Sequence, residues 1–282
     1  MKVLKFGGTS VGSPERMKNV SKLITDGNKQ IVVLSAMSGT TNNLVEISDY
    51  YKKGNDDGAS NMISALEKKY DGVIEGLLQT QAFRDKAKAI ITRECDVVRS
   101  FAHKPFNVQA EKMILARGEI MSTNLVQLYH EENNIPSVLL NSLEFMFVDG
   151  DGEPVMTKIE SELKKVLQRY PDTTLFITQG FICTNDKGEV DNLKRGGSDY
   201  SASLIGAAIN ADVVEIWTDI DGIHNNDPRI VKNTHPIAEM SFDEAAELAY
   251  FGAKILHPST VHNTKVKNIP VLLKNTMEPH AK

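Results

Sequence analysis

Short apolar segments alternate along the chain with longer segments in which apolar residues recur at helical spacing. The segment at residues 30–36 is apolar without alternation, which is typical of a strand in a sheet that is covered on both faces. Further strands are expected at residues 3–6, 137–140, 174–178, 212–219 and 270–274. Helices are expected at residues 13–26, from near residue 44, at 158–169, at 242–252 and from residue 258. This order predicts an α/β fold with a parallel sheet.

Residues 51–132 interrupt this alternation of predicted strands and helices. They are rich in charge and poor in strand formers, and their apolar residues recur at helical spacing. We therefore expect a helical insertion, which ends in a helical segment at residues 109–121.

Small polar loops follow several of the predicted strands. Residues 7–10 follow the first strand, residues 38–43 follow the second, and Thr218 and Asp219 close a later one. Open α/β sheets bind their ligands outside the carboxyl ends of the strands, so we expect the functional site at this edge.

A loop that leads into a helix combines two glycines with both signs of charge. Ser198 is the expected N-cap, so that Asp199 would open a helix whose positive end faces the loop. Arg195 suits a carboxylate or phosphate, and Asp199 could hold an ammonium group. Gly196 and Gly197 allow backbone N–H groups to approach an anion. The stretch fits a zwitterionic or phosphorylated ligand, but by itself it fits a solvated glycine-rich turn equally well.

Lys5 ends the first predicted strand beside Gly7 and Gly8. A lysine fixed there, next to backbone N–H groups, is well placed to bridge phosphate oxygens, although a strand-terminal lysine that only reaches solvent is an equal alternative. The sequence contains no Walker A motif, no nucleophile elbow and no HExxH motif.

Composition narrows the classes of function. The formal net charge of −5 over 282 residues argues against a nucleic-acid partner. Two cysteines are too few for a disulfide framework and are typical of a reducing compartment. No apolar run approaches a membrane span and the start carries no signal-peptide pattern, so we expect a cytoplasmic protein without a membrane partner. The histidines show no metal-ligand spacing, and no dedicated protein metal site is expected.

Taken together, the motifs resemble the catalytic domain of aspartate kinases in the amino acid kinase superfamily. The matching stretches follow the family order and lie at residues 5–12, 35–42, 117–123, 195–202, 217–229 and 251–258. The resemblance implies a three-layer αβα sandwich with a mainly parallel central sheet, of the carbamate kinase-like type, plus the helical insertion.

The same resemblance implies one amino acid kinase domain over residues 1–282. Its amino-acid-binding lobe would cover about residues 1–192, with the insertion at about 51–132. Its nucleotide-binding lobe would cover about residues 193–282. The C-terminal regulatory domains of the family are expected to be absent.

The activity implied is transfer of the γ-phosphoryl group of ATP to the β-carboxylate of L-aspartate, which gives 4-phospho-L-aspartate and ADP and begins lysine, threonine and methionine biosynthesis. The residues fit this chemistry because a carboxylate nucleophile is already ionised at neutral pH and needs no general base. Catalysis then consists of placing two anions in line and neutralising the charge between them.

Residue roles follow from the resemblance. Lys5 would contact the transferring phosphoryl group, with backbone donors from Gly7 and Gly8. Asp199 would orient that lysine or bind the substrate ammonium group. The remaining substrate contacts are assigned to Ser35, Thr41, Glu119, Arg195, Gly196, Gly197 and Ser198, with Arg195 on the α-carboxylate and Glu119 on the ammonium group.

ATP with Mg²⁺ is the implied nucleotide, and the ion is expected to be held mainly by phosphates and water. The nucleotide contacts are assigned to Thr218, Asp219, His224, Arg229 and Lys254. The family usually carries a tyrosine where this chain has His224, which leaves stacking on the adenine open.

Two other interpretations stay open. One is a related kinase that acts on glutamate, N-acetylglutamate, carbamate or UMP, against which Thr41, Glu119 and the stretch from Arg195 to Asp199 favour aspartate. The other is a nucleotide or amino-acid binding module with little turnover. The resemblance also suggests a homodimer.

Overall fold

Six strands form one sheet in the computed structural model, which describes residues 1–193, 197–219, 222, 237–250 and 258–279. The strand order is β3-β4-β2-β1-β7-β8, and each neighbouring pair is parallel. The strands are β1 (Lys2–Phe6), β2 (Gln30–Leu34), β3 (Val138–Leu140), β4 (Leu175–Gln179), β7 (Val213–Thr218) and β8 (Val271–Asn275). The predicted parallel α/β fold is confirmed. A separate antiparallel pair consists of β5 (Ile182–Thr184) and β6 (Val190–Asn192).

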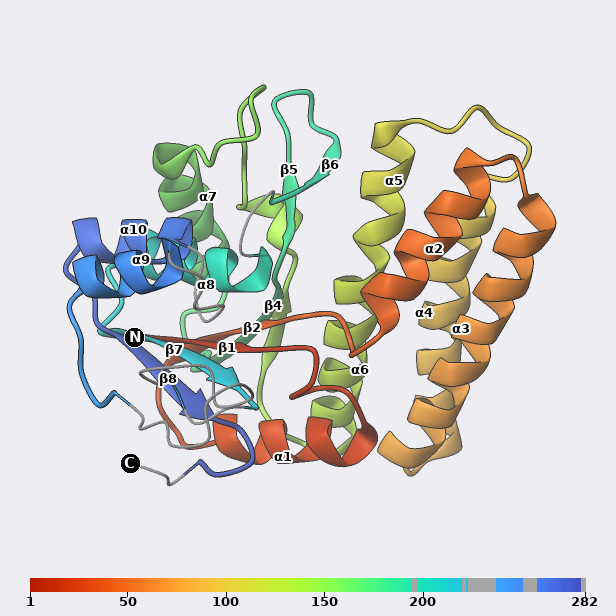
Figure 1. Ribbon diagram of the computed structural model, residues 1–282. Coiled ribbons are helices and arrows are strands. Elements are labelled where there is room, and N and C mark those ends of the chain that lie inside the picture. Colours follow the sequence, from red (N-terminus) through yellow and green to blue (C-terminus); the bar gives the residue numbers. More distant parts are fainter. Residues whose placement is uncertain (194–196, 220–221, 223–236, 251–257, 280–282) are drawn as a thin grey trace, which may run out of the picture.

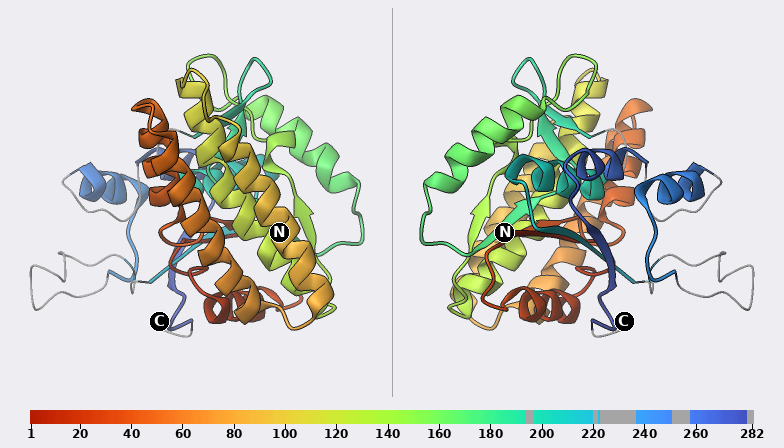
Figure 2. Two further views of the ribbon diagram at one scale, coloured as in Figure 1. Left: turned by 90° about the vertical axis from the view of Figure 1, so that its right-hand side faces the viewer. Right: turned by 90° about the vertical axis from the view of Figure 1, so that its left-hand side faces the viewer.

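Helices cover both faces of the sheet, so the molecule has the predicted three layers (Figure 1). The helices are α1 (Pro14–Ile24), α2 (Thr40–Lys52), α3 (Asp56–Leu77), α4 (Gln81–Arg99), α5 (Val108–Leu115), α6 (Arg117–Glu132), α7 (Met156–Gln168), α8 (Gly197–Ile209), α9 (Phe242–Tyr250) and α10 (Pro258–Val266), with a short 3₁₀ helix η1 (Ser142–Glu144). Helices α2 to α5 gather on one side of the molecule, beside the sheet (Figure 1, Figure 2).

Alternate residues of the central strands enter two separate apolar cores. On β1, Leu4 and Phe6 pack with α1, α6 and the insertion helices, whereas Val3 packs with α7 and α8 on the opposite face. Successive side chains of a strand point to opposite faces, so strands covered on both sides must be apolar at nearly every position. This explains why β2 is buried throughout.

The helical segment predicted at about residues 51–132 consists of the end of α2 and helices α3 to α6. The segment expected at residues 109–121 is divided between α5 and α6, which meet at Ala116. Helix α6 packs against both the sheet and α4, and its buried Arg117 donates to Glu94 of α4 over 2.9 Å. Helix α6 therefore belongs to the layer on the sheet and also anchors the insertion.

Two helices begin earlier than the sequence predicts. Helix α2 begins at Thr40 and not near residue 44, because Gly39 adopts a left-handed backbone with φ of 79° and turns the chain directly into the helix. Helix α8 begins at Gly197, where φ is 48°, so the prediction of Ser198 as N-cap was wrong. Thr41 and Ser198 therefore lie in the first turns of their helices.

Two glycines allow the loops at the carboxyl edge to approach one another. A Cβ at Gly8 would lie 2.8 Å from the carbonyl oxygen of Ala36, and a Cβ at Gly180 would lie 2.3 Å from the hydroxyl of Ser198. Such contacts exclude a side chain at either position. The loops after β1 and β2, and the start of α8 beside the end of β4, therefore depend on these glycines for their close packing.

Candidate active site

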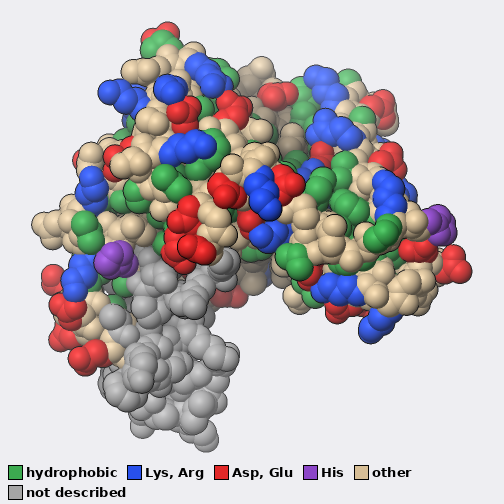
Figure 3. Space-filling view, turned by 90° about the horizontal axis from the view of Figure 1, so that it is seen from above, with side chains coloured by type: hydrophobic (Ala, Val, Ile, Leu, Met, Phe, Trp, Pro, Cys, Tyr) green, Lys and Arg blue, Asp and Glu red, His purple; other side chains and the backbone are tan. Residues whose placement is uncertain are grey.

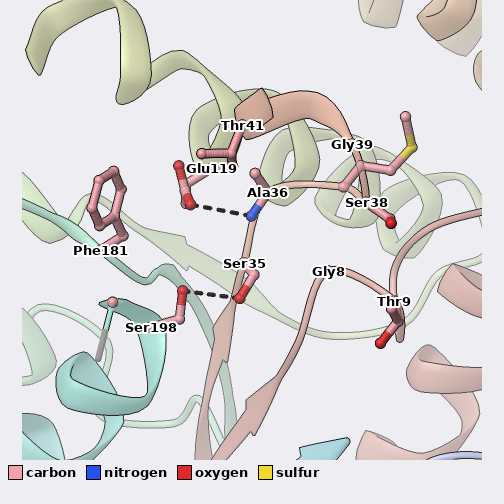
Figure 4. A pocket seen from close by; sticks show the side chains of 12 residues that line it. Gly8, Thr9, Ser35, Ala36, Ser38, Gly39, Thr41, Glu119, Phe181 and Ser198 are labelled. Carbon is pink, nitrogen blue, oxygen red and sulfur yellow. Dashed lines mark hydrogen bonds between the residues drawn. The ribbon is translucent and has the colours of Figure 1, made fainter. Parts of the chain in front are cut away.

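A cavity of about 400 Å³ lies at the carboxyl ends of β1 and β2, where the sheet meets α2, α6 and α8 (Figure 4). Its lining consists of Gly8, Thr9, Ser35, Ala36, Met37, Ser38, Gly39, Thr41, Glu119, Phe181, Gly197 and Ser198. The lining residues are mostly small, and their hydroxyl groups and one carboxyl group give a small ligand several hydrogen-bonding partners.

The structure brings together in this lining six of the residues predicted for the site. They come from four separate parts of the chain: Gly8, Ser35, Thr41, Glu119, Gly197 and Ser198. Ser35 follows β2 and donates a hydrogen bond of 2.9 Å to the hydroxyl of Ser198 in α8. This bond joins residues 163 positions apart and fixes the floor of the cavity between the two elements.

Glu119 is buried in the wall that α6 forms, with 4% of its surface exposed. Its Oε1 accepts a hydrogen bond of 3.3 Å from the backbone N–H of Ala36 (Figure 4). Its Oε2 has no hydrogen-bond partner among the residues that the structure describes. Burial raises the pKa of Glu119 to about 8, although the bond from Ala36 opposes that rise. A buried carboxyl group in the lining of a cavity, with one oxygen that has no hydrogen-bond partner among the described residues, is a candidate site for a cationic ligand group.

Lys5 and Asp199 form an ion pair near the cavity, with 2.7 Å between Nζ and Oδ1. Both side chains are largely buried, at 12% and 22% exposure. Lys5 lies on β1 and Asp199 in the first turn of α8, so the pair joins the sheet to the helix that carries Ser198. Of the two roles predicted for Asp199, this geometry fits the one that orients the lysine.

The loop after β1 is held by contacts from several directions. The carbonyl of Gly8 accepts from the N–H of Ser38 over 3.1 Å, and the carbonyl of Thr9 accepts from Arg16 over 2.7 Å. The N–H of Gly7 donates to the carbonyl of Trp217 in β7 over 3.4 Å. Lys5 therefore stands beside a glycine loop whose path is fixed by its neighbours.

Sequence reasoning missed Phe181, whose side chain lines the cavity beside Glu119 (Figure 4). Its backbone is left-handed with φ of 67°, which is unusual for an aromatic residue. Its N–H donates to the hydroxyl of Ser201 over 2.8 Å, and that bond holds the turn. An aromatic residue directly after a strand and a glycine was the available signal. The other missed residues are Thr9, Ala36, Met37, Ser38 and Gly39.

The predicted nucleotide residues are only partly described. Thr218 ends β7, and its hydroxyl donates to Asp219 over 3.3 Å on an exposed part of the sheet edge. Five further predicted residues lie outside the described residues: Arg195, Gly196, His224, Arg229 and Lys254. Thr218 is nevertheless close to the loop after β1, because Trp217, which precedes it, bonds to Gly7.

Metal and membrane features were searched in the described part of the chain. No group of three or more His, Cys, Asp and Glu side chains in these residues could hold a metal ion. No helix in these residues is long and apolar enough to cross a membrane. Seen from above, acidic and basic side chains lie interspersed over the surface (Figure 3).

The cavity lies at the carboxyl edge of a parallel sheet that is covered on both faces, which is where α/β proteins bind their ligands. The sequence pattern of the amino acid kinase family matches residues 1–275, and the chain belongs to that family.

The curated relatives are aspartokinases. The chain is 34% identical to the bifunctional aspartokinase/homoserine dehydrogenase of Buchnera aphidicola, over 98% of this chain and 35% of the relative. It is 33% identical to lysine-sensitive aspartokinase 3 of Escherichia coli, over 99% of this chain and 62% of the relative. The chain thus spans less than two thirds of the length of these relatives.

A solved structure shares the fold over the whole chain. The crystal structure of E. coli aspartokinase III in complex with aspartate and ADP superimposes with a TM-score of 0.89 and 31% identity. It covers 100% of this chain and 63% of that protein's chain.

Proposed function

We propose that this chain is an aspartate kinase domain, which transfers the γ-phosphoryl group of ATP to the β-carboxylate of L-aspartate. The observation that carries the proposal is the buried carboxyl group of Glu119 in the lining of the cavity, whose Oε2 has no hydrogen-bond partner in the described part of the chain. Once ionised, this carboxyl group would offer a buried negative charge to the ammonium group of an amino acid. Support comes from the similar E. coli enzyme, which was crystallised with aspartate and ADP.

On the substrate side, Glu119 receives the ammonium group, and Ser35, Thr41 and Ser198 offer hydroxyls inside the same cavity. Gly197 adds backbone at the start of α8, where N–H groups and the helix dipole favour an anion. Arg195 and Gly196, which precede it in sequence, are assigned to the α-carboxylate. The β-carboxylate then remains free to act as the nucleophile.

On the phosphoryl side, Lys5 provides the cation that faces the charge developing between donor and acceptor. Asp199 fixes the direction of that cation through the ion pair of 2.7 Å. The carboxylate acceptor is ionised at neutral pH, so no residue has to remove a proton from it. The rate acceleration therefore comes only from positioning the two reactants and from neutralising the charge between them.

Nucleotide binding is assigned to Gly7 and Gly8 together with Thr218, Asp219, His224, Arg229 and Lys254. Magnesium would accompany ATP. The ion is proposed to be held mainly by phosphates and water, as is usual for the magnesium complex of ATP. The bound ion would neutralise phosphate charge.

The reaction product points to a role at the start of lysine, threonine and methionine biosynthesis. Cys95 and Cys183 are free and buried, which supports the predicted cytoplasmic location. The homodimer suggested by the family resemblance stays a prediction.

The test is ADP release with Mg-ATP and L-aspartate in the presence of hydroxylamine, which traps an acyl phosphate as a hydroxamate. We expect hydroxamate with aspartate and none with glutamate or N-acetylglutamate, and no ADP release with UMP, whose phosphorylated product hydroxylamine does not trap. Hydroxamate with glutamate would assign the site to a related kinase. Tight binding of ATP and aspartate without ADP release would favour the binding module.

A further inference from the structure

A buried hydrogen bond joins the loop after β1 to the segment that follows the last strand. The hydroxyls of Ser10 and Thr276 lie 2.8 Å apart, although the residues are 266 positions apart in sequence. Ser10 is 3% exposed and Thr276 is 9% exposed, so water does not compete freely for either group.

Both partners are fixed on their own sides. The N–H of Ser10 donates to the carbonyl of Gly7 over 3.0 Å, which closes the turn after β1. The N–H of Thr276 donates to the carbonyl of Thr218 over 2.8 Å, which ties Thr276 to the end of β7. The hydroxyl pair therefore links the turn that begins at Gly7 to the strand end that carries Thr218.

Among the described residues, few other contacts hold the loop of residues 7–12 on the side that faces β7. Its other fixed points are the bond of Gly8 to Ser38 toward β2 and the bond of Thr9 to Arg16 toward α1. Toward β7, the bond of Gly7 to Trp217 is long at 3.4 Å. The β1–β7 ladder, with Phe6 opposite Trp217, holds the start of the loop, and the buried hydroxyl pair adds a contact of good length at Ser10, beyond the end of that ladder.

We propose that Thr276 is a positioning residue for the phosphoryl transfer site, which it serves by holding the loop of residues 7–12 against the end of β7 through Ser10. This inference rests on the proposed function, because it assumes that Gly7 and Gly8 contact the phosphates. Thr276 itself does not line the cavity. Its role is to keep the backbone donors of the loop and the nucleotide residues at the end of β7 in one arrangement.

The test compares Thr276→Val, which removes the hydroxyl while keeping the branched shape, with Thr276→Ser, which keeps the hydroxyl. The constants measured are KM for Mg-ATP, KM for aspartate and kcat, together with the midpoint of thermal unfolding. Loss of one buried hydrogen bond corresponds to about a fivefold change. We expect KM for Mg-ATP to rise about fivefold in Thr276→Val, with KM for aspartate nearly unchanged, and the wild-type value to return in Thr276→Ser.

A double-mutant cycle with Ser10→Ala supplies the second measurement. If the two hydroxyls act as a pair, the double variant will be no weaker for Mg-ATP than either single variant. Additive losses, or equal KM for Mg-ATP in Thr276→Val and Thr276→Ser, would overturn the inference. A purely structural role would lower the unfolding midpoint and the amount of active enzyme without raising KM for Mg-ATP.

Failure of the proposed function would look different. In that case the wild-type chain would form no hydroxamate. The effect of Thr276→Val could then still be measured through the Kd of a fluorescent ATP analogue. We expect this Kd to be about fivefold weaker in the variant. An unchanged Kd would contradict the inference.

Discussion

The candidate site contains two carboxylates in opposite environments. Asp199 lies beside the ammonium group of Lys5, at 2.7 Å, and keeps partial exposure. Glu119 is almost fully buried, accepts one backbone hydrogen bond and leaves its second oxygen without a partner among the described residues. Burying an unpaired carboxylate costs free energy, which raises the pKa of Glu119, and carboxyl groups perturbed in this way are concentrated at functional sites.

This difference in environment indicates which cationic group each of the two carboxyl groups interacts with. Asp199 already has its cation within the chain, so its contribution is to direct Lys5. Glu119 has none among the described residues, and its burial keeps it mostly protonated near pH 7, so a cationic ligand group would favour its ionisation. The two groups therefore divide the site into a phosphoryl side that is neutralised in advance and a substrate side that is completed on binding.

Removal of Lys5 should have the largest effect. In Lys5→Ala the cation between donor and acceptor is lost, and we expect kcat to fall about 10²–10³-fold, the size found when one preorganised donor is removed from a transition state. ATP binding, measured by titration, should be mostly retained. The matched control is Lys2→Ala at the other end of β1, which should leave kcat unchanged. Near-normal turnover in Lys5→Ala would show that Lys5 does not act on the transferring phosphoryl group.

Glu119→Gln should have the second largest effect, and this effect should be on the binding of aspartate. Glutamine can still accept from Ala36 but carries no charge for the ammonium group. We expect KM for aspartate to rise about 10–100-fold, which corresponds to one charge-assisted hydrogen bond, with a smaller change in KM for Mg-ATP. Glu131→Gln, exposed on the same helix, is the control.

The pH profile sharpens this test. Because the pKa of Glu119 is raised to about 8, the carboxylate becomes available as the pH rises toward 8. KM for aspartate should therefore fall over that range in the wild type. The fall should be absent in Glu119→Gln, and an unchanged profile in the variant would show that another group titrates.

Asp199→Asn should have a moderate effect on the phosphoryl side. Lys5 keeps its charge but loses the partner that directs it, and we expect kcat to fall about tenfold, within the range of a lost charge-assisted bond. KM for aspartate should change little if Asp199 serves the lysine. A large rise in KM for aspartate with kcat retained would instead place Asp199 on the substrate ammonium group. Asp172→Asn, on an exposed loop, is the control.

The last prediction concerns stability and not turnover. The folded state holds a proton on Glu119 from about pH 4.5 to about 8, where the unfolded state has already released it. The contribution of this group to stability therefore falls as the pH rises through that range. Glu119→Gln should unfold at the same temperature as the wild type near pH 5 and should be more stable near pH 8.5, by up to about 1.4 kcal/mol for each unit by which the pKa of Glu119 is raised. Equal midpoints at both pH values would contradict the burial of a free carboxylate.

The sequence predicted the site residues at the ends of strands better than it predicted those in the first turns of helices. Apolar segments without alternation identified the strands, and the parallel order then placed Lys5 and Ser35 at one edge. The start of α2 was misplaced because it depends on the left-handed backbone of Gly39, which local propensity does not reveal. Phe181 was missed because its turn is held by Ser201, a tertiary contact.

The opposite environments of the two carboxylates were also beyond the sequence. Glu119 was assigned to the ammonium group by family resemblance, but its burial results from the packing of α6 against β2 and β4. The choice between two roles for Asp199 required the distance to Lys5. Both depend on how separate segments meet in space.

The central claim, that Glu119 is reserved for the ammonium group of aspartate, is tested most directly by proton release. Aspartate binding to the ADP-loaded protein would be measured by calorimetry at pH 7 in buffers of different ionisation enthalpy. With a pKa of about 8, Glu119 is mostly protonated at pH 7 before binding and ionised once the ammonium group is in place. The account predicts release of nearly one proton in the wild type and none in Glu119→Gln. Binding without proton release, or with equal release in the variant, would contradict it.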